Sequence, residues 1–105
     1  VMAAIKDYAA DNTVFGLDVG NNTEWAIRQI PLNRSQKFTL SGWFATMGYG
    51  LPAGMAAKLS YPERPVITIS GDGGFAMVMQ DLITEVKYEM PIVNVVLENK
   101  SFGFI

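Results

Sequence analysis

Three short segments carry most of the residues in this sequence that could bind a phosphate or a metal ion. Residues 18–22, 71–74 and 98–101 are rich in Gly, Asp and Asn, and each follows a predicted β-strand. In a parallel sheet, ligands bind outside the carboxyl ends of the strands, near the point where the strand order reverses. If the last two strands are neighbours, Asp72 and Asn99 lie close together at that edge.

The segment 71–74 (GDGG) permits two interpretations. Its glycines and Ala76 fit the G-x-G-x-x-A fingerprint of dinucleotide-binding proteins, between a strand and a helix. Asp72 argues against that interpretation, because its carboxylate would lie among the N–H groups that receive a pyrophosphate. A divalent cation would remove this conflict, and Asn99 could add an amide oxygen to its hard-cation shell. The glycines would still let the backbone approach the phosphates. No G-K-[ST] follows, so the segment is not a P-loop.

The elements that must position these segments alternate between strand and helix patterns. Apolar and β-branched runs predict strands at residues 13–19, 37–40, 66–70 and 92–97. Helical patterns cover residues 1–10, 23–30, 46–60 and 75–89. This alternation, with short connections, predicts an α/β fold with a parallel sheet of right-handed βαβ units and helices on both faces.

Two helices and the last strand carry more detailed expectations. In residues 46–60, apolar side chains recur at i, i+4 spacing from Met47 to Leu59. In residues 75–89, one apolar stripe faces away from Asp81 and Glu85, which we expect on a solvated or interface face. The strand at 92–97 is nearly all apolar, so we expect both of its faces to be covered.

Composition excludes several classes of protein and of site. The chain has 105 residues, 50% of them hydrophobic, which suits one compact domain, and a net charge of −2 does not suggest a nucleic-acid surface. It contains no His and no Cys, which excludes Ser-His-Asp systems, the usual zinc sites and disulfides. No apolar run approaches a membrane span, so we expect a cytoplasmic protein without a membrane partner. Both ends look cut, so we expect residues 1–105 to be one truncated domain of a longer protein.

The spacing of the candidate residues resembles the signature of thiamine-diphosphate enzymes. That signature is G-D-G, a spacer and N-N; here residues 71–73 precede Asn99 by a spacer of 25 residues, and Glu98 replaces the first Asn. Residues 42–59 (GWFATMGYGLPAGMAAKL) resemble the stretch before this motif in members that use pyruvate, and residues 18–22 resemble their upstream diphosphate loop. The resemblance covers almost the whole chain. It is to the pyrophosphate-binding domain of the pyruvate oxidase/acetolactate synthase family, and to pyruvate oxidases before acetolactate synthases.

The resemblance implies a role for each residue at a matching position. Asp72 and Asn99 would bind Mg²⁺ through side-chain oxygens, and Ser101 through its backbone carbonyl. Met47 would hold thiamine diphosphate in its bent form, and Phe104 and Ile105 would line the reaction chamber, so these three are the catalytic candidates. The remaining residues implied to bind the cofactor are Gly20, Asn21, Asn22, Ala45, Gly73, Gly74, Phe102 and Gly103.

Ordinary structural explanations compete with these roles. An acidic residue such as Asp72 commonly caps a helix, and Asn21, Asn22 and Asn99 are common turn residues. Met47, at helical spacing, is by itself more typical of a core position. Core packing also explains the apolar residues at 104–105. We expect Trp25, Trp43 and Tyr49 to serve in packing or subunit contacts.

The resemblance also implies an activity and partners. Pyruvate would be oxidatively decarboxylated with phosphate and oxygen to acetyl phosphate, CO₂ and hydrogen peroxide, by thiamine diphosphate, Mg²⁺ and FAD. The FAD site would lie outside residues 1–105, in a homotetramer whose partner subunit supplies the activating Glu. The segment alone would be inactive. Two other classes stay open: a nicotinamide-binding domain, which needs no metal bridge, and a non-catalytic α/β interaction module.

Overall fold

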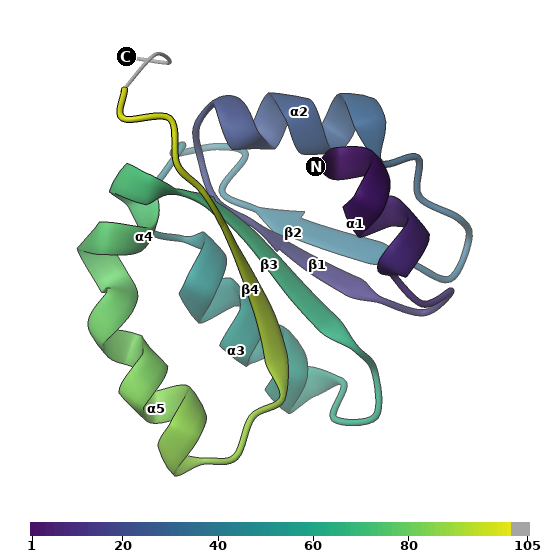
Figure 1. Ribbon diagram of the computed structural model, residues 1–105. Helices are drawn as coiled ribbons and strands as arrows, with labels where there is room; N and C mark the ends of the chain where they lie inside the picture. Colours follow the sequence, from purple (N-terminus) through teal and green to yellow (C-terminus); the bar gives the residue numbers. More distant parts are fainter. Residues whose placement is uncertain (102–105) are drawn as a thin grey trace.

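The computed structural model describes residues 1–101 (Figure 1). Its strands are β1 (Val14–Leu17), β2 (Lys37–Leu40), β3 (Val66–Gly71) and β4 (Ile92–Leu97). Its helices are α1 (Met2–Tyr8), α2 (Asn21–Gln29), α3 (Gly50–Ser60), α4 (Asp72–Val78) and α5 (Leu82–Lys87), with a 3₁₀ turn, η1 (Met79–Asp81), between the last two. The strands β2 and β4 have the bounds predicted from the sequence.

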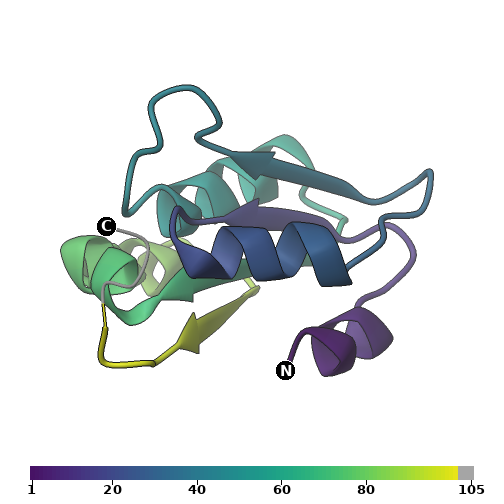
Figure 2. The same cartoon turned by 90° about the horizontal axis from the view of Figure 1, so that it is seen from above.

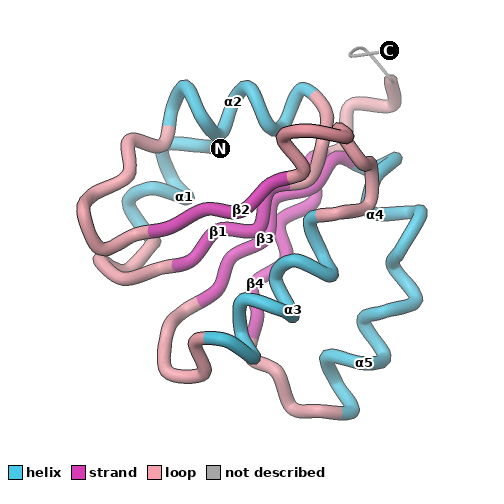
Figure 3. Tube along the Cα trace, turned by 180° about the vertical axis from the view of Figure 1, so that it is seen from behind, coloured by secondary structure: helices cyan, strands magenta, loops and turns pink. Residues whose placement is uncertain are grey.

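The four strands form one parallel sheet in the order β2-β1-β3-β4. Figure 3 shows the strands together, with α1 and α2 on one side of the sheet and α3 and α5 on the other. The chain leaves β1 toward one edge of the sheet, through α2 to β2, and leaves β3 toward the other, through α4 and α5 to β4. The strand order therefore reverses between β1 and β3, and the carboxyl ends of these strands form the expected binding edge. The predicted α/β fold, with a parallel sheet and helices on both faces, is confirmed.

The main hydrophobic core lies between the sheet and the layer of α1 and α2. Viewed from above, α2 lies in front of the sheet and α3 behind it (Figure 2). Alternate residues of a strand point to the same face, so Phe15, Leu17, Ile67 and Ile69 all face this layer. The buried residues of this core are Met2, Ile5, Phe15, Leu17, Ala26, Ile30, Ile67 and Ile69. It holds α2 against the two central strands from which the binding edge is built.

The opposite face of the sheet meets α3 through small residues. A Cβ placed on Gly16 of β1 would lie 2.9 Å from the carbonyl oxygen of Gly50, and one on Gly54 would lie 2.2 Å from Cγ2 of Thr68. Any larger residue at these positions would force the helix off the sheet. The close approach of α3 to β1 and β3 therefore depends on glycine.

The helix predicted from residue 46 begins only at Gly50. Ala45 has φ 49° and Gly48 has φ 84°, and both values lie outside the right-handed helical region. Met47 is consequently a loop residue, and Leu59, at the other end of the expected apolar stripe, is 70% exposed. The regular spacing of apolar residues was misleading here, because the buried face of α3 consists mostly of Gly and Ala.

The long helix predicted at 75–89 is instead three pieces, α4, η1 and α5. A 3₁₀ turn has about 3.0 residues per turn, whereas an α-helix has about 3.6. Over its three residues, η1 therefore rotates α5 about the helix axis by about 60° compared with an uninterrupted α-helix. The expected polar face is therefore partly buried: Glu85 is only 6% exposed, whereas Ile83 and Val86 are more than 70% exposed. The prediction of a solvated Glu85 was wrong.

A polar chain joins Glu85 to the sheet. Asn94 Nδ2 donates a hydrogen bond to Glu85 Oε2 at 2.8 Å, and Thr68 Oγ1 donates one to Asn94 Oδ1 at 2.5 Å. Within residues 1–101, Glu85 Oε1 is buried without a hydrogen-bond partner. The pKa of Glu85 lies above its ordinary value, because burial raises it by more than the hydrogen bond from Asn94 lowers it.

The strand β4 is less covered than its composition predicts. Val93 and Val96 are 46% and 40% exposed, on opposite faces of the strand, because β4 is an edge strand of the described sheet. Among the helices of residues 1–101, none combines the length and the hydropathy needed to cross a membrane.

Candidate functional site

A pocket of about 300 Å³ lies at the carboxyl ends of β1, β3 and β4. Its walls come from the β1–α2 connection, the loop before α3, the β3–α4 junction and the residues after β4. Ten of the predicted site residues line it: Gly20, Asn21, Asn22, Ala45, Met47, Asp72, Gly73, Gly74, Asn99 and Ser101. The fold thus brings together all the site candidates that lie within residues 1–101. Phe102, Gly103, Phe104 and Ile105 lie outside the described residues.

The wall of the pocket that follows β1 contains the first residues of helix α2 and not a turn. Asn21 and Asn22 are the first residues of α2, so the expectation of turn residues was wrong. Asn22 is 3% exposed, and its Nδ2 donates hydrogen bonds to the carbonyl oxygens of Asp18 at 2.9 Å and Ile69 at 3.1 Å. Its amide group therefore ties β1 to β3 at the point where the strand order reverses. The Oδ1 atom of Asn22 lies close to Gly20, because a Cβ added to Gly20 would be 2.8 Å from this oxygen.

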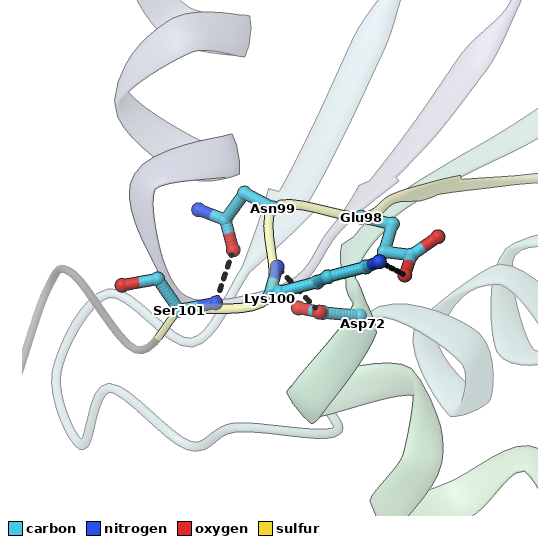
Figure 4. A network of polar contacts seen from close by, with 5 residues as sticks. All are labelled: Asp72, Glu98, Asn99, Lys100 and Ser101. Atoms are coloured by element: carbon cyan, nitrogen blue, oxygen red, sulfur yellow. Dashed lines mark hydrogen bonds and ion pairs between the residues drawn. The ribbon is translucent and has the colours of Figure 1, made fainter.

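The opposite wall places Asp72 beside the segment that follows β4 (Figure 4). The pairing of β3 with β4 brings the ends of both strands together, as expected. Asp72 Oδ2 accepts a hydrogen bond from the backbone N–H of Lys100 at 3.2 Å, and Asn99 Oδ1 accepts one from the N–H of Ser101 at 3.0 Å. Asp72 is the first residue of α4 and not its N-cap, which is Gly71, and its Oδ1 accepts a hydrogen bond from Gly73 N–H at 3.0 Å.

The donor set of this wall suits a hard divalent cation. Asp72 offers a carboxylate, Asn99 an amide oxygen and Ser101 a backbone carbonyl, and all three residues line the pocket. Over residues 1–101, no group of three or more Asp or Glu side chains could enclose a metal by itself. Mg²⁺ is commonly held by one or two carboxylates together with the phosphates of a ligand, so the single carboxylate fits Mg²⁺ with a phosphate ligand.

The loop before α3 forms the third wall. It carries Ala45 and Met47, which face the pocket, and Gly48, whose N–H donates a hydrogen bond of 2.8 Å to Asp18 Oδ1. Because Met47 is a loop residue beside the pocket, its position does not follow from helical packing. Met47 is therefore not a residue of α3. Its role, as a packing residue or as a residue that holds the cofactor, stays a prediction.

Four more residues line the pocket: Val19, Trp25, Gly71 and Leu97. Val19 and Gly71 lie within the candidate segments but were given no role of their own, whereas sequence reasoning missed Trp25 and Leu97 as site residues. Trp25 follows Asn21 by one helical turn. A helix predicted to begin at residue 21 would therefore have placed Trp25 on the same side as Asn21. Asp18 is fully buried and does not line the pocket. It was given no role of its own from the sequence, although a carboxylate directly after an apolar strand is visible there.

Several known proteins are similar in sequence to this chain. Residues 18–105 match a protein family described as "Thiamine pyrophosphate enzyme, C-terminal TPP binding domain". The Bacillus subtilis protein YdaP, whose description as thiamine pyrophosphate-containing is provisional, is 51% identical over 105 residues, which are 100% of this chain and 18% of YdaP. Pyruvate oxidase of Lactiplantibacillus plantarum is 45% identical over 105 residues, 100% of this chain and 17% of that enzyme.

A third relative is a different enzyme. The large subunit of acetolactate synthase isozyme 1 of Escherichia coli is 35% identical over 102 residues, 97% of this chain and 18% of that subunit. The chain therefore spans less than a fifth of the length of these curated relatives.

Proposed function

Because this chain belongs to the thiamine pyrophosphate enzyme family, through its C-terminal TPP-binding domain, we propose that the pocket holds the diphosphate end of the cofactor with Mg²⁺. One observation carries this proposal: a single pocket, at the point where the strand order reverses, contains the acid, the amides and the glycines from distant segments. Asp72, Asn99 and Ser101 would hold the metal. Gly73 and Gly74 would leave room for the phosphates to approach the backbone.

The chain's own residues would bind and orient the cofactor. Thiamine diphosphate, when bound, supplies the electron sink for breaking the bond to the carboxylate carbon of a 2-oxo acid. Met47 would hold the cofactor ring from the loop before α3. Trp25, on α2, adds an aromatic side chain to the β1–α2 side of the pocket and would keep water from the cofactor.

For the whole protein we propose the activity of a pyruvate oxidase. It would convert pyruvate, phosphate and oxygen into acetyl phosphate, CO₂ and hydrogen peroxide, with FAD bound outside this segment. The higher identity to a pyruvate oxidase, 45% against 35% for an acetolactate synthase, supports this choice. A cytoplasmic homotetramer, with the activating Glu from a partner subunit, belongs to the same proposal. Acetolactate synthase is the second candidate, since several such synthases match the chain.

The test separates cofactor binding from the choice of reaction. The full natural chain should bind thiamine diphosphate only with Mg²⁺, measured by calorimetry with and without EDTA. Asp72→Ala should abolish retention of the cofactor after desalting. Glu98→Gln is the matched control, because Glu98 is an exposed carboxylate beside Asn99 that contacts only Lys100, at 4.0 Å, among the described ion pairs.

Retention of thiamine diphosphate by Asp72→Ala at the wild-type stoichiometry would contradict the metal assignment. Tight binding of NAD in EDTA, without binding of thiamine diphosphate, would contradict the proposed cofactor. With pyruvate, phosphate, oxygen and FAD, formation of acetyl phosphate together with hydrogen peroxide indicates the oxidase. Acetolactate without peroxide would instead indicate the synthase.

A further inference from the structure

Asp18 is a fully buried carboxylate directly behind the pocket. It follows β1 and is 0% exposed, and its backbone N–H donates a hydrogen bond to Ile69 O of β3 at 2.9 Å. Its Oδ1 accepts two hydrogen bonds from backbone N–H groups, from Val19 at 2.7 Å and from Gly48 at 2.8 Å. Gly48 lies 30 residues away in sequence, so this side chain joins the end of β1 to the loop before α3.

The bond to Gly48 fixes a part of that loop with a left-handed backbone conformation. Gly48 has φ 84°, a conformation that other residues rarely adopt, and its N–H has no backbone acceptor outside regular elements. Met47, the preceding residue, lines the pocket, whereas Asp18 does not. The Asp18 carboxylate therefore acts on the pocket through the Gly48 peptide and not by direct contact.

The second carboxylate oxygen faces another wall of the pocket. A Cβ placed on Gly74 would lie 2.6 Å from Asp18 Oδ2, so α4 approaches this oxygen at its first turn. Within residues 1–101, Oδ2 is buried without a hydrogen-bond partner. A buried carboxylate oxygen left unpaired is destabilising, so packing alone does not explain an acid at this position.

We infer that Asp18 is a positioning residue, whose carboxylate sets the Met47 loop against the glycines of the β3–α4 junction. One buried side chain touches Gly48 on one side and approaches Gly74 on the other, and thereby sets the distance between two walls of the pocket. Its effect on the cofactor rests on the proposed function, whereas its effect on the loop does not.

The first test needs no cofactor. In the full natural chain without ligand, residue-resolved hydrogen exchange should show the Gly48 amide protected. Asp18→Ala should raise its exchange rate at least about tenfold, and Asp18→Asn, which keeps an acceptor oxygen, should restore most of the protection. Thr13→Val is the matched control, because Thr13 Oγ1 is also buried without a partner within residues 1–101, and Thr13 precedes β1, at the end of the strand away from the loop.

The second test follows the cofactor. With thiamine diphosphate and Mg²⁺ at saturation, proton exchange at the C2 atom of the cofactor should fall about 10²-fold in Asp18→Ala, since a misplaced Met47 spoils the geometry. The dissociation constant should change less, and Asp18→Asn should recover the rate. A structural role alone would lower the melting temperature without changing exchange at C2.

Three results would overturn the inference: an unprotected Gly48 amide in the wild type, unchanged loop exchange in a folded Asp18→Ala variant, or equal effects of Asp18→Ala and Thr13→Val on the loop. The wild-type measurement decides even if Asp18→Ala does not fold. If the wild-type chain does not bind thiamine diphosphate, the proposed function fails, and the hydrogen-exchange test of Asp18 still stands.

Discussion

Replacing Gly54 with Ala should separate α3 from the sheet. The added Cβ would lie 2.2 Å from Cγ2 of Thr68, whereas its next neighbours, Ile92 Cγ2 and Thr68 Cβ, are at ordinary distances of 3.7 and 3.8 Å. Carbon atoms prefer separations of about 3.5–4.0 Å, so one contact requires a local shift of more than about 1 Å. The methyl group of Thr68 cannot exchange places with Oγ1 without breaking the hydrogen bond to Asn94.

The expected loss of stability follows from two opposing contributions. Inserting a methyl group into a packed core costs about 1–3 kcal/mol. Ala in place of Gly inside a helix returns about 0.5–1 kcal/mol. We therefore expect Gly54→Ala to lower the free energy of unfolding by about 1–2 kcal/mol. The variant Ala56→Gly, at an exposed position of α3, measures the helix contribution separately.

Thr68→Ser is the designed rescue, because it removes Cγ2 and keeps Oγ1. In the double variant, the methyl group added by Gly54→Ala enters the space that the Thr68 methyl group leaves. Denaturant unfolding of all four proteins, with hydrogen exchange of β3 as a local measurement, should give a favourable coupling of about 1–2 kcal/mol. Additive effects, or a Gly54→Ala variant as stable as the wild type, would refute the packing argument.

Further predictions concern the pocket and the buried acid. Met47→Ala should reduce the C2 proton-exchange rate of bound cofactor by about 10²-fold with a smaller change in affinity; an unchanged rate beside a lowered melting temperature would make Met47 a packing residue only. Binding of thiamine diphosphate should quench Trp25 fluorescence; an equal decrease of fluorescence in Trp25→Phe would contradict contact between Trp25 and the cofactor. Burial raises the pKa of Glu85, so native protein holds more protons than unfolded protein just above the ordinary pKa. The contribution of Glu85 to the free energy of unfolding should therefore fall as the pH rises above 4.5, the ordinary pKa of the group, and Glu85→Gln should lose this contribution; equal pH dependence of the two proteins would contradict it.

The sequence predicted the four parallel strands and ten of the residues that line the pocket. Turn residues after β-branched runs mark the ends of β1, β3 and β4, and parallel pairing then brings Asp72 next to the residues after β4. That result follows from the geometry of parallel strands. It needs no knowledge of the loops.

Helix boundaries and helix faces were harder to predict, for three physical reasons. The positive φ angles of Ala45 and Gly48 end a helical pattern that apolar spacing alone extends. The turn at η1 changes the face that α5 presents, so Glu85 is buried although it lies opposite the apolar stripe. The buried face of α3 consists of small residues, which give little periodic signal. Each of these features depends on contacts between segments distant in sequence.

The pairing of β1 with β3 has a consequence for folding kinetics. Asn22 and Ile69, which are hydrogen-bonded across this junction, are 47 residues apart in sequence, and α2, β2 and α3 intervene. Closing so long a loop is slow compared with forming a helix or a local turn. The pocket does not exist until this closure has occurred, because its two main walls follow β1 and β3. A ligand of this pocket therefore cannot guide the early steps of folding, but it selects molecules in which the central strands have paired, and slows their unfolding.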